Sequence, residues 1–227
     1  AAQAANLRLA SFGGRGPGID FDAMRAAASA DPPADITVED EDIHAIFLTS
    51  GSTGTPKGVM LSHRASWFRA FGGNTRTPAS GGRGEVNMFP FFHWAGWHFT
   101  LCAWAHRHAI HLTPRADAAS LNPIIERWRP RFMYGIPAVW ERLLESREFG
   151  RTQSLRTVMT GTYRVEPSLV AALRKRLPGI EMTIGMGATE LGVGIQIGDD
   201  DIDRKPYSVG LPAPGVEAKI EDGELCA

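Results

Sequence analysis

Hydrophobic runs recur at a regular pitch in the second half of the chain. Short apolar segments are centred near Ile110, Met133, Val158 and Met182, at steps of 23, 25 and 24 residues. Stretches with helical spacing of apolar residues lie between them. Strands that alternate with helices in this way are typical of right-handed βαβ crossovers and a parallel sheet. The pattern predicts an α/β fold, a mostly parallel sheet flanked by helices.

The helices between these strands each show one apolar face. The third helix is expected to open at Pro167 and to end at the Pro-Gly pair at 178–179. The three faces consist of Leu121, Ile124, Ile125 and Trp128, then Val139, Trp140, Leu143 and Leu144, then Leu169, Leu173 and Leu177.

An earlier apolar run, IHAIFLT at 43–49, contains β-branched residues and predicts a buried strand. A loop rich in Gly, Ser and Thr follows it, and then a short apolar VML. Ser62 is the expected N-cap of a helix with Ala65, Phe68 and Phe71 on its apolar face.

The domain organisation follows from these patterns. Residues 1–42 form a partly irregular lead-in with a short helix near 20–29, and residues 43–205 form the α/β core. Residues 206–227 alternate like the start of a β-rich subdomain, which ends abruptly. We therefore expect the chain to be a fragment.

Unusual loops follow four of the expected strands. Parallel sheets bind ligands beyond the carboxyl ends of their strands, so we expect these loops to meet at one edge. The loops are TSGSTG (49–54), YGIP (134–137), TGTY (160–163) and GMGATE (185–190).

Composition limits the classes of partner. The formal net charge is −1, which gives no support for a nucleic-acid-binding surface. Cys102 and Cys226 match neither a disulfide framework nor a metal motif. The most apolar window, 94–105, is too short for a transmembrane segment, and the N-terminus does not resemble a signal peptide. We expect a cytoplasmic protein, with a membrane-peripheral location and a homodimer left open.

The glycine-rich loop has the chemistry of an anion site. Backbone N–H groups without bulky side chains, hydroxyls and a lysine suit a polyphosphate. A Walker A loop would need Gly-Lys-Ser/Thr running directly into a helix. Here Pro56 precedes Lys57, Gly58 follows it, and VML comes before any helix. The P-loop NTPase interpretation therefore fails.

The stretch TSGSTGTPKGV (49–59) instead closely resembles the signature loop of the adenylate-forming superfamily, over eleven positions without a gap. Three further stretches are similar to this family's conserved segments and occur in its order. They are FPFFHWAG (89–96), GMGATEL (185–191) and YSVGLPAPGVEAKI (207–220). The resemblance is to the acyl-CoA synthetase branch, and to part of its large N-terminal domain.

The resemblance implies a reaction in two steps. ATP and a carboxylate form an acyl-adenylate and pyrophosphate, and a thiol, often coenzyme A, then takes the acyl group. The implied ligands are ATP or AMP, Mg²⁺, coenzyme A and a small carboxylic acid, here a fatty or related apolar acid. A protein promotes such chemistry mainly by positioning and electrostatics.

Site residues are carried over by motif position. Thr189 would bind the α-phosphate, and Glu190 would bind Mg²⁺ with Thr49 nearby. His93 would orient the carboxylate or guard the thiol route, so the implied catalytic residues are His93, Thr189, Glu190 and Lys57. Trp94, Gly135 and Ile136 would line the acyl pocket. The implied nucleotide-binding residues are Thr49, Ser50, Gly51, Ser52, Thr53, Gly54, Lys57, Gly161, Thr162, Tyr163, Gly185, Met186, Gly187 and Thr189.

Two departures from the family pattern bear on function. Met186 occupies a position where the family usually has an aromatic residue that stacks on adenine. In the loop after residue 160, which the resemblance places against adenine, Tyr163 and Arg164 differ from the family pattern. Tyr163 is a candidate for the missing aromatic surface. The resemblance also implies a mobile C-terminal domain, which we do not expect within these 227 residues, so we expect the isolated chain to be catalytically impaired. The alternative is a non-catalytic nucleotide-binding or interaction module that keeps this fold.

Overall fold

The computed structural model describes residues 9–13, 16–32, 34–50, 54–72, 84–150 and 153–227. They divide into two compact units, residues 1–38 and residues 39–227. In the first unit, β1 (Ala10–Ser11) pairs in parallel with β2 (Ile19–Asp20), and α1 (Phe21–Ala26) follows. The Asp20 side chain caps α1, which confirms the short helix expected near residues 20–29.

A seven-stranded sheet forms the centre of the second unit, in the order β11-β10-β9-β8-β7-β5-β6. The five strands from β9 to β6 are parallel, and β10 and β11 extend the sheet antiparallel at one edge. The strands are β5 (Glu85–Asn87), β6 (Ile110–Leu112), β7 (Phe132–Tyr134), β8 (Thr157–Gly161), β9 (Glu181–Ala188), β10 (Gly192–Gly198) and β11 (Leu211–Pro212). The predicted α/β architecture is confirmed.

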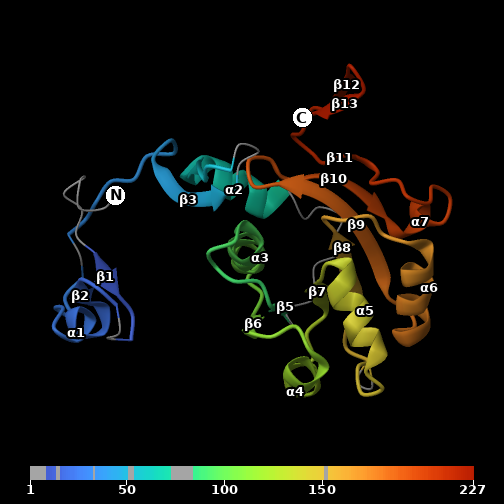
Figure 1. The fold of residues 1–227 in the computed structure, drawn as a ribbon, viewed down its shortest axis with the longest axis horizontal. Coiled ribbons are helices and arrows are strands. Elements are labelled where there is room, and N and C mark those ends of the chain that lie inside the picture. Colours follow the sequence, from blue (N-terminus) through green and yellow to red (C-terminus); the bar gives the residue numbers. More distant parts are fainter. Residues whose placement is uncertain (1–8, 14–15, 33, 51–53, 73–83, 151–152) are drawn as a thin grey trace. The chain divides into compact units, whose positions relative to one another are not determined.

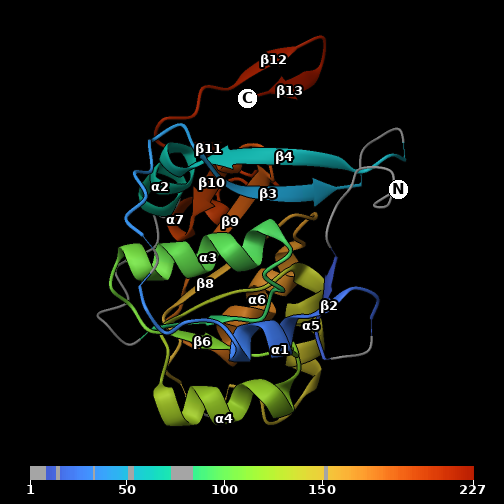
Figure 2. The ribbon, with the colours of Figure 1, turned by 90° about the vertical axis from the view of Figure 1, so that its left-hand side faces the viewer.

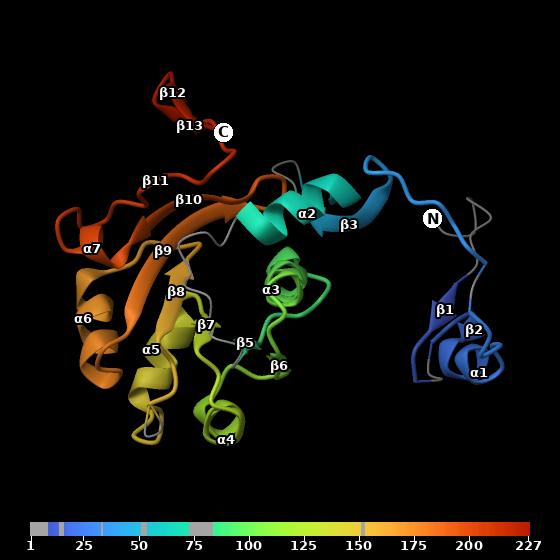
Figure 3. The same ribbon diagram turned by 180° about the vertical axis from the view of Figure 1, so that it is seen from behind.

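Helices cover both faces of this sheet (Figures 1 and 3). One face carries α4 (Ala118–Trp128), α5 (Pro137–Glu145) and α6 (Pro167–Arg176). The other carries α3 (Trp94–Ala105), and α2 (His63–Gly72) packs against α3. Strand alternation explains the two layers: Met133 points to the first face, and Phe132 and Tyr134 point to the second.

The strands on either side of the glycine-rich loop, β3 (Ile43–Thr49) and β4 (Lys57–Ser62), form a separate antiparallel pair (Figure 2). The strand over 43–49 is present, but the prediction that it is buried is wrong. Only Phe47 is buried, while Ile46 and Leu48 are 57% and 75% exposed. The cause is that the hairpin pairs with no strand of the main sheet among the described residues.

Helix α2 begins as expected. The Ser62 hydroxyl accepts a hydrogen bond from the Ala65 N–H at 3.2 Å, which satisfies one donor of the first turn. Phe68 and Phe71, predicted to lie on the apolar face, remain 56% and 41% exposed.

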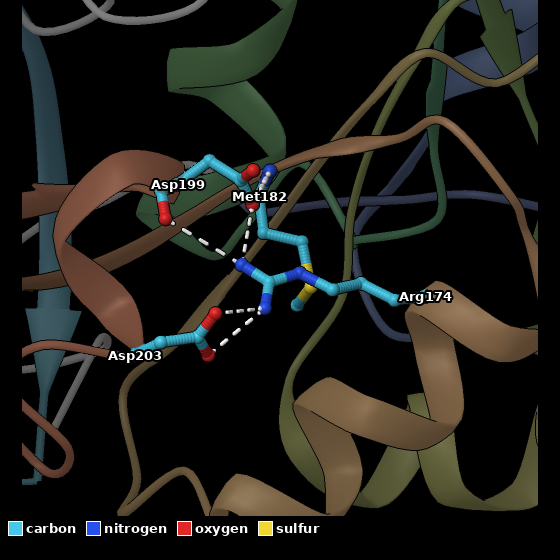
Figure 4. Close-up of polar contacts among 4 residues, drawn as sticks. All are labelled: Arg174, Met182, Asp199 and Asp203. Carbon is cyan, nitrogen blue, oxygen red and sulfur yellow. Dashed lines mark hydrogen bonds and ion pairs between the residues drawn. The ribbon is translucent and has the colours of Figure 1, made fainter.

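An arginine on α6 ties the start of β9 to the short helix α7 (Asp199–Ile202), as Figure 4 shows. Arg174 contacts Asp199 at 2.9 Å and Asp203 at 2.7 Å. Asp199 also accepts the Met182 N–H at 3.0 Å, so one carboxylate joins helix and strand. This cluster fixes β9, whose other end enters the candidate site.

The remaining strands, β12 (Lys219–Glu221) and β13 (Glu224–Cys226), form a hairpin of their own. Among the described residues, no helix has the length and apolar character needed to cross a membrane.

Candidate functional site

Three of the four unusual loops meet at one edge of the sheet. Strands β7, β8 and β9 are parallel neighbours, so YGIP, TGTY and GMGATE all lie at their carboxyl ends. The Gly135 N–H donates to the Met159 carbonyl at 3.0 Å, and Gly161 lies opposite Gly185. The fourth loop, TSGSTG, follows β3, which pairs with β4 and not with a strand of this sheet among the described residues. Residues 51–53 of this loop lie outside the described residues, so its expected place at this edge stays a prediction.

Two glycines at this edge are required by close backbone contacts. A Cβ on Gly161, whose φ is +155°, would lie 1.9 Å from the Gly185 carbonyl oxygen. A Cβ on Gly187 would lie 2.0 Å from the Gly192 carbonyl oxygen. Any side chain there would push the backbones apart, so these glycines allow β8, β9 and β10 to approach closely at this edge.

A cavity of about 180 Å³ lies at this edge. Apolar groups from three elements form one side of it: Trp94 and Phe99 of α3, Met159 of β8 and Val193 of β10. The cavity brings together seven residues implied by the sequence, namely His93, Trp94, Thr162, Gly185, Met186, Gly187 and Thr189. Gly135 and Ile136 do not line it, although Ile136 packs against the same apolar cluster.

His93 lies at the N-terminus of α3. It is the N-cap residue, and its Nδ1 accepts the Ala95 N–H at 3.1 Å. Because Nδ1 is the acceptor, the neutral ring carries its proton on Nε2. The capping bond therefore sets both the orientation and the tautomer of a ring that lines the cavity.

Trp94 stacks on a buried histidine one turn further along α3. The ring centroids of Trp94 and His98 are 4.3 Å apart, with an interplanar angle of 18°. Burial, helped by the positive charge of Arg69, lowers the pKa of His98 to about 3. His98 therefore stays neutral and supports Trp94 without placing a charge beside the apolar lining.

A second cavity of about 330 Å³ adjoins the first. It shares Thr162, Gly185 and Met186 with the first cavity and adds Tyr163, Arg164 and Tyr207, among other residues. Tyr163 is 69% exposed, so its ring is accessible. The carboxyl end of β9 thus separates a mostly apolar cavity from one lined by phenol rings and a guanidinium.

Thr162 lies between the two cavities in a left-handed backbone conformation, with φ at +70°. Its hydroxyl contacts the Tyr134 hydroxyl at 2.7 Å. Tyr134 is buried between Phe89 and Phe99, whose ring centroids lie 5.0 and 4.8 Å from its own. Sequence reasoning missed Tyr134, although a tyrosine at the end of a buried strand was a signal for a polar contact there.

Thr189 and Glu190 form the turn between β9 and β10, where the Leu191 N–H donates to the Ala188 carbonyl at 3.2 Å. Arg69 of α2 donates to the main-chain carbonyls of both residues, at 2.9 Å for Thr189. Burial lowers the Arg69 pKa, and the nearby Glu190 carboxylate opposes that shift. Arg69 was also missed, because nothing in the linear pattern connects α2 to a turn 120 residues away.

The glycine-rich loop is described only at its two ends. Thr49 pairs with Lys57 across the hairpin, and its hydroxyl donates to the Lys57 carbonyl at 3.5 Å. Gly51, Ser52 and Thr53 lie outside the described residues. Among the described residues, no hydrogen bond or ion pair joins Thr49, Ser50, Gly54 or Lys57 to residues 185–190. Their shared contact with a nucleotide stays a prediction.

The predicted metal ligands can be compared with what Mg²⁺ requires. The described residues contain no group of three or more His, Cys, Asp or Glu side chains that could hold a metal ion. Mg²⁺ commonly uses one or two carboxylates together with substrate phosphates and water. The exposed Glu190 fits that mode, because its carboxylate is accessible next to Thr189, which lines the cavity.

Comparisons with known proteins identify the family of this chain. The profile of the AMP-binding enzyme family matches residues 11–226. The chain is 31% identical over 202 residues to a 3-methylmercaptopropionyl-CoA ligase of Ruegeria pomeroyi, covering 82% of this chain and 37% of that protein. It is 28% identical to a medium-chain-fatty-acid–CoA ligase of Ectopseudomonas oleovorans, with 82% and 37% covered.

Solved structures show the same fold. The O-succinylbenzoate coenzyme A synthetase of Bacillus subtilis, in complex with ATP and magnesium ion, superposes with a TM-score of 0.80 at 23% identity. This match covers 92% of the present chain and 44% of that one. The chain thus spans well under half the length of these relatives. A family profile that covers almost the whole chain shows that it belongs to the AMP-binding enzyme family, among relatives that are CoA ligases.

Proposed function

We propose that this chain is the nucleotide- and acid-binding core of an ATP-dependent acid–thiol ligase. The observation that supports this most is the cavity at the carboxyl edge of β7–β9, where His93, Trp94 and Thr189 come together. Because the chain spans about 40% of its relatives' length, the complete reaction is proposed for a protein in which this chain is one part.

In the proposed first step, a carboxylate oxygen attacks the α-phosphorus of ATP. A new P–O bond forms, the bond to the β-phosphate oxygen breaks, and pyrophosphate leaves with that electron pair. The carboxylate thereby gains a leaving group, AMP, that is far better than oxide. The thiolate of coenzyme A then attacks the acyl carbon, and AMP departs.

The residues of the cavity would act by holding the reactants. Thr189 would donate its hydroxyl to the α-phosphate, and the Nε2–H of His93 would donate to the carboxylate oxygen that does not react. Lys57 and the glycine-rich loop would bind the β- and γ-phosphates. Mg²⁺, held by Glu190 with Thr49 nearby, would neutralise phosphate charge when bound. The chain's main contribution is to align two anions that otherwise repel each other.

The lining of the cavity favours an apolar acid. Trp94, Phe99, Met159 and Val193 offer no charge to a substrate tail. A dry cavity of about 150 Å³ is enough to bind benzene. The cavity of about 180 Å³ is also lined by His93 and Thr189, which we propose to hold the carboxylate and the α-phosphate, so it suits a compact tail such as a short alkyl chain or one ring.

The test is magnesium-dependent ATP–pyrophosphate exchange by the full-length protein that carries this chain, with a panel of short, medium and long fatty acids and aromatic acids. We expect exchange that depends on the acid and is strongest with compact apolar acids. ATP binding without exchange for any acid would contradict the proposal and favour the non-catalytic nucleotide-binding alternative.

A further inference from the structure

Tyr207 adopts an unusual backbone conformation beside the second cavity. Its φ is +69°, in the left-handed region that side chains other than glycine rarely adopt. A glycine would adopt this conformation without strain, so the tyrosine is kept here at a cost in backbone energy.

The strained backbone brings the Tyr207 ring to the cavity that also holds Tyr163 and Met186. The ring is 56% exposed and is packed on one side by a cation. The guanidinium carbon of Arg164 lies 4.3 Å from the centroid of the Tyr207 ring. Arg164 in turn forms an ion pair with Glu166, with 2.8 Å between Nε and Oε1. The ring is therefore fixed from one side and open to a ligand.

The chemistry of this cavity suits a flat, electron-rich heterocycle. It combines two phenol rings with a polarisable thioether, and it adjoins the cavity that contains Thr189. Aromatic faces stack on nucleobases, and a thioether packs against a ring with little geometric demand. A purine in the second cavity would place the rest of its nucleotide at the shared residues Thr162, Gly185 and Met186.

We propose that Tyr207 supplies the aromatic surface on which this protein stacks the purine of its nucleotide, replacing the aromatic side chain that is missing at Met186. This inference rests on the proposed nucleotide-binding function. It assigns the missing contact to a residue in a different loop from the expected candidate, Tyr163.

Tyr207→Gly separates the stacking role from a structural one, because the two predict opposite results. Removing the strain should leave the melting temperature unchanged or raise it. Losing the ring should raise the Kd for ATP and AMP about tenfold, measured by calorimetry on the full-length protein. Tripolyphosphate, which has no base, should bind to the variant and the wild type equally. Tyr207→Phe, which keeps an aromatic ring, should bind the nucleotide about as tightly as the wild type.

A matched control is available on α4. Arg129 also has a left-handed backbone, with φ at +51°, but lines neither cavity of the site. Arg129→Gly should relieve strain in the same way and leave the Kd for ATP unchanged. The double variant Tyr207→Gly/Met186→Phe places an aromatic ring at another residue that lines the same cavity, and we expect it to regain most of the lost affinity.

The inference is overturned if Tyr207→Gly binds ATP as tightly as the wild type does. It is also overturned if the variant loses affinity for ATP and for tripolyphosphate to the same extent. A wild-type protein that binds no nucleotide would overturn it as well. The two proposals can fail separately. If Tyr207→Gly loses affinity for ATP but the wild-type protein shows no acid-dependent exchange, the stacking role is supported and the proposed ligase activity is refuted.

Discussion

The guanidinium of Arg69 donates a hydrogen bond of 2.9 Å to the main-chain carbonyl of Thr189. A second nitrogen of the same guanidinium, Nη2, donates to the main-chain carbonyl of Glu190, so one planar side chain holds two successive peptide groups. The contact joins α2, which directly follows the glycine-rich hairpin, to the turn proposed to bind the α-phosphate and the metal. Arg69 is thus a positioning residue for that turn.

Arg69→Lys keeps the charge but loses the forked geometry. We expect kcat/KM for exchange to fall about tenfold, or roughly 1.4 kcal/mol, because hydrogen bonds from a charged group are worth about this much. The Mg²⁺ concentration for half-maximal activity should rise, since the turn that carries Glu190 loses a main-chain anchor. A titration of exchange rate against Mg²⁺ measures both effects.

Arg64→Lys is the control for Arg69. Arg64 lies on the same helix in an exposed pair with Glu41, whose charged atoms are 3.5 Å apart. Such surface pairs contribute little, so this variant should match the wild type. An unchanged Mg²⁺ dependence in Arg69→Lys would show that the arginine supports only the fold.

Tyr134→Phe removes the hydroxyl that holds Thr162 and keeps the ring stacked between Phe89 and Phe99. We expect a loss of about 1 kcal/mol in the free energy of unfolding, typical of one buried hydrogen bond. The KM for ATP should rise several-fold, because the left-handed Thr162 between the two cavities loses its anchor.

A double-mutant cycle with Thr162→Ala isolates this contact. If the two hydroxyls act together, the double variant should be about as impaired as either single variant. Fully additive effects on the KM for ATP would show that Tyr134 and Thr162 act separately.

Glu85 predicts a specific dependence of stability on pH. It is buried on β5, and burial raises its pKa to about 8. Its oxygen lies 3.7 Å from His108, whose pKa is lowered by burial, so near pH 7 the two groups meet as neutral partners. Because the folded state holds the proton more tightly, stability should fall as pH rises from about 4.5 to about 8 and then level off.

Urea unfolding at pH 5, 6, 7 and 8 tests this dependence against Glu85→Gln, which carries no titrating proton. The difference in unfolding free energy between wild type and variant should shrink by roughly 1 kcal/mol per pH unit. Taking the difference removes the opposite contribution of His108, which destabilises the folded state as pH falls. Parallel curves for the two proteins would show that Glu85 is not held protonated.

The sequence predicts most of the parallel sheet because its strands are apolar and evenly spaced. The runs near Ile110, Met133, Val158 and Met182 correspond to β6, β7, β8 and β9. Strand β5 was missed because two of its three residues are polar. Asn87 is buried by donating to the Gly96 carbonyl at 2.7 Å and to the Thr100 hydroxyl at 3.1 Å, and no hydrophobic pattern reveals such bonds.

The candidate site is predicted where its residues lie in local motifs and missed where they do not. His93 lies within the stretch at 89–96, and Met186 and Thr189 lie within the stretch at 185–191. In the structure all three residues line one cavity. Arg69, Tyr134 and Tyr207, which we propose as further residues of the site, are connected to it through contacts between distant segments or through a single backbone angle. The exposed β3 strand was mistaken for a buried one because an apolar run alone does not reveal whether a partner covers it.

The central claim is that the carboxyl edge of β7–β9 binds an acyl-adenylate. A crystal structure of the full-length protein with a non-hydrolysable acyl-sulfamoyl-adenosine tests it most directly. We predict that the purine lies against Tyr207, the sulfamoyl group within hydrogen-bond distance of Thr189, and the acyl tail against Trp94 and Phe99. Density for the ligand at any other place, with this cavity empty, would contradict the account.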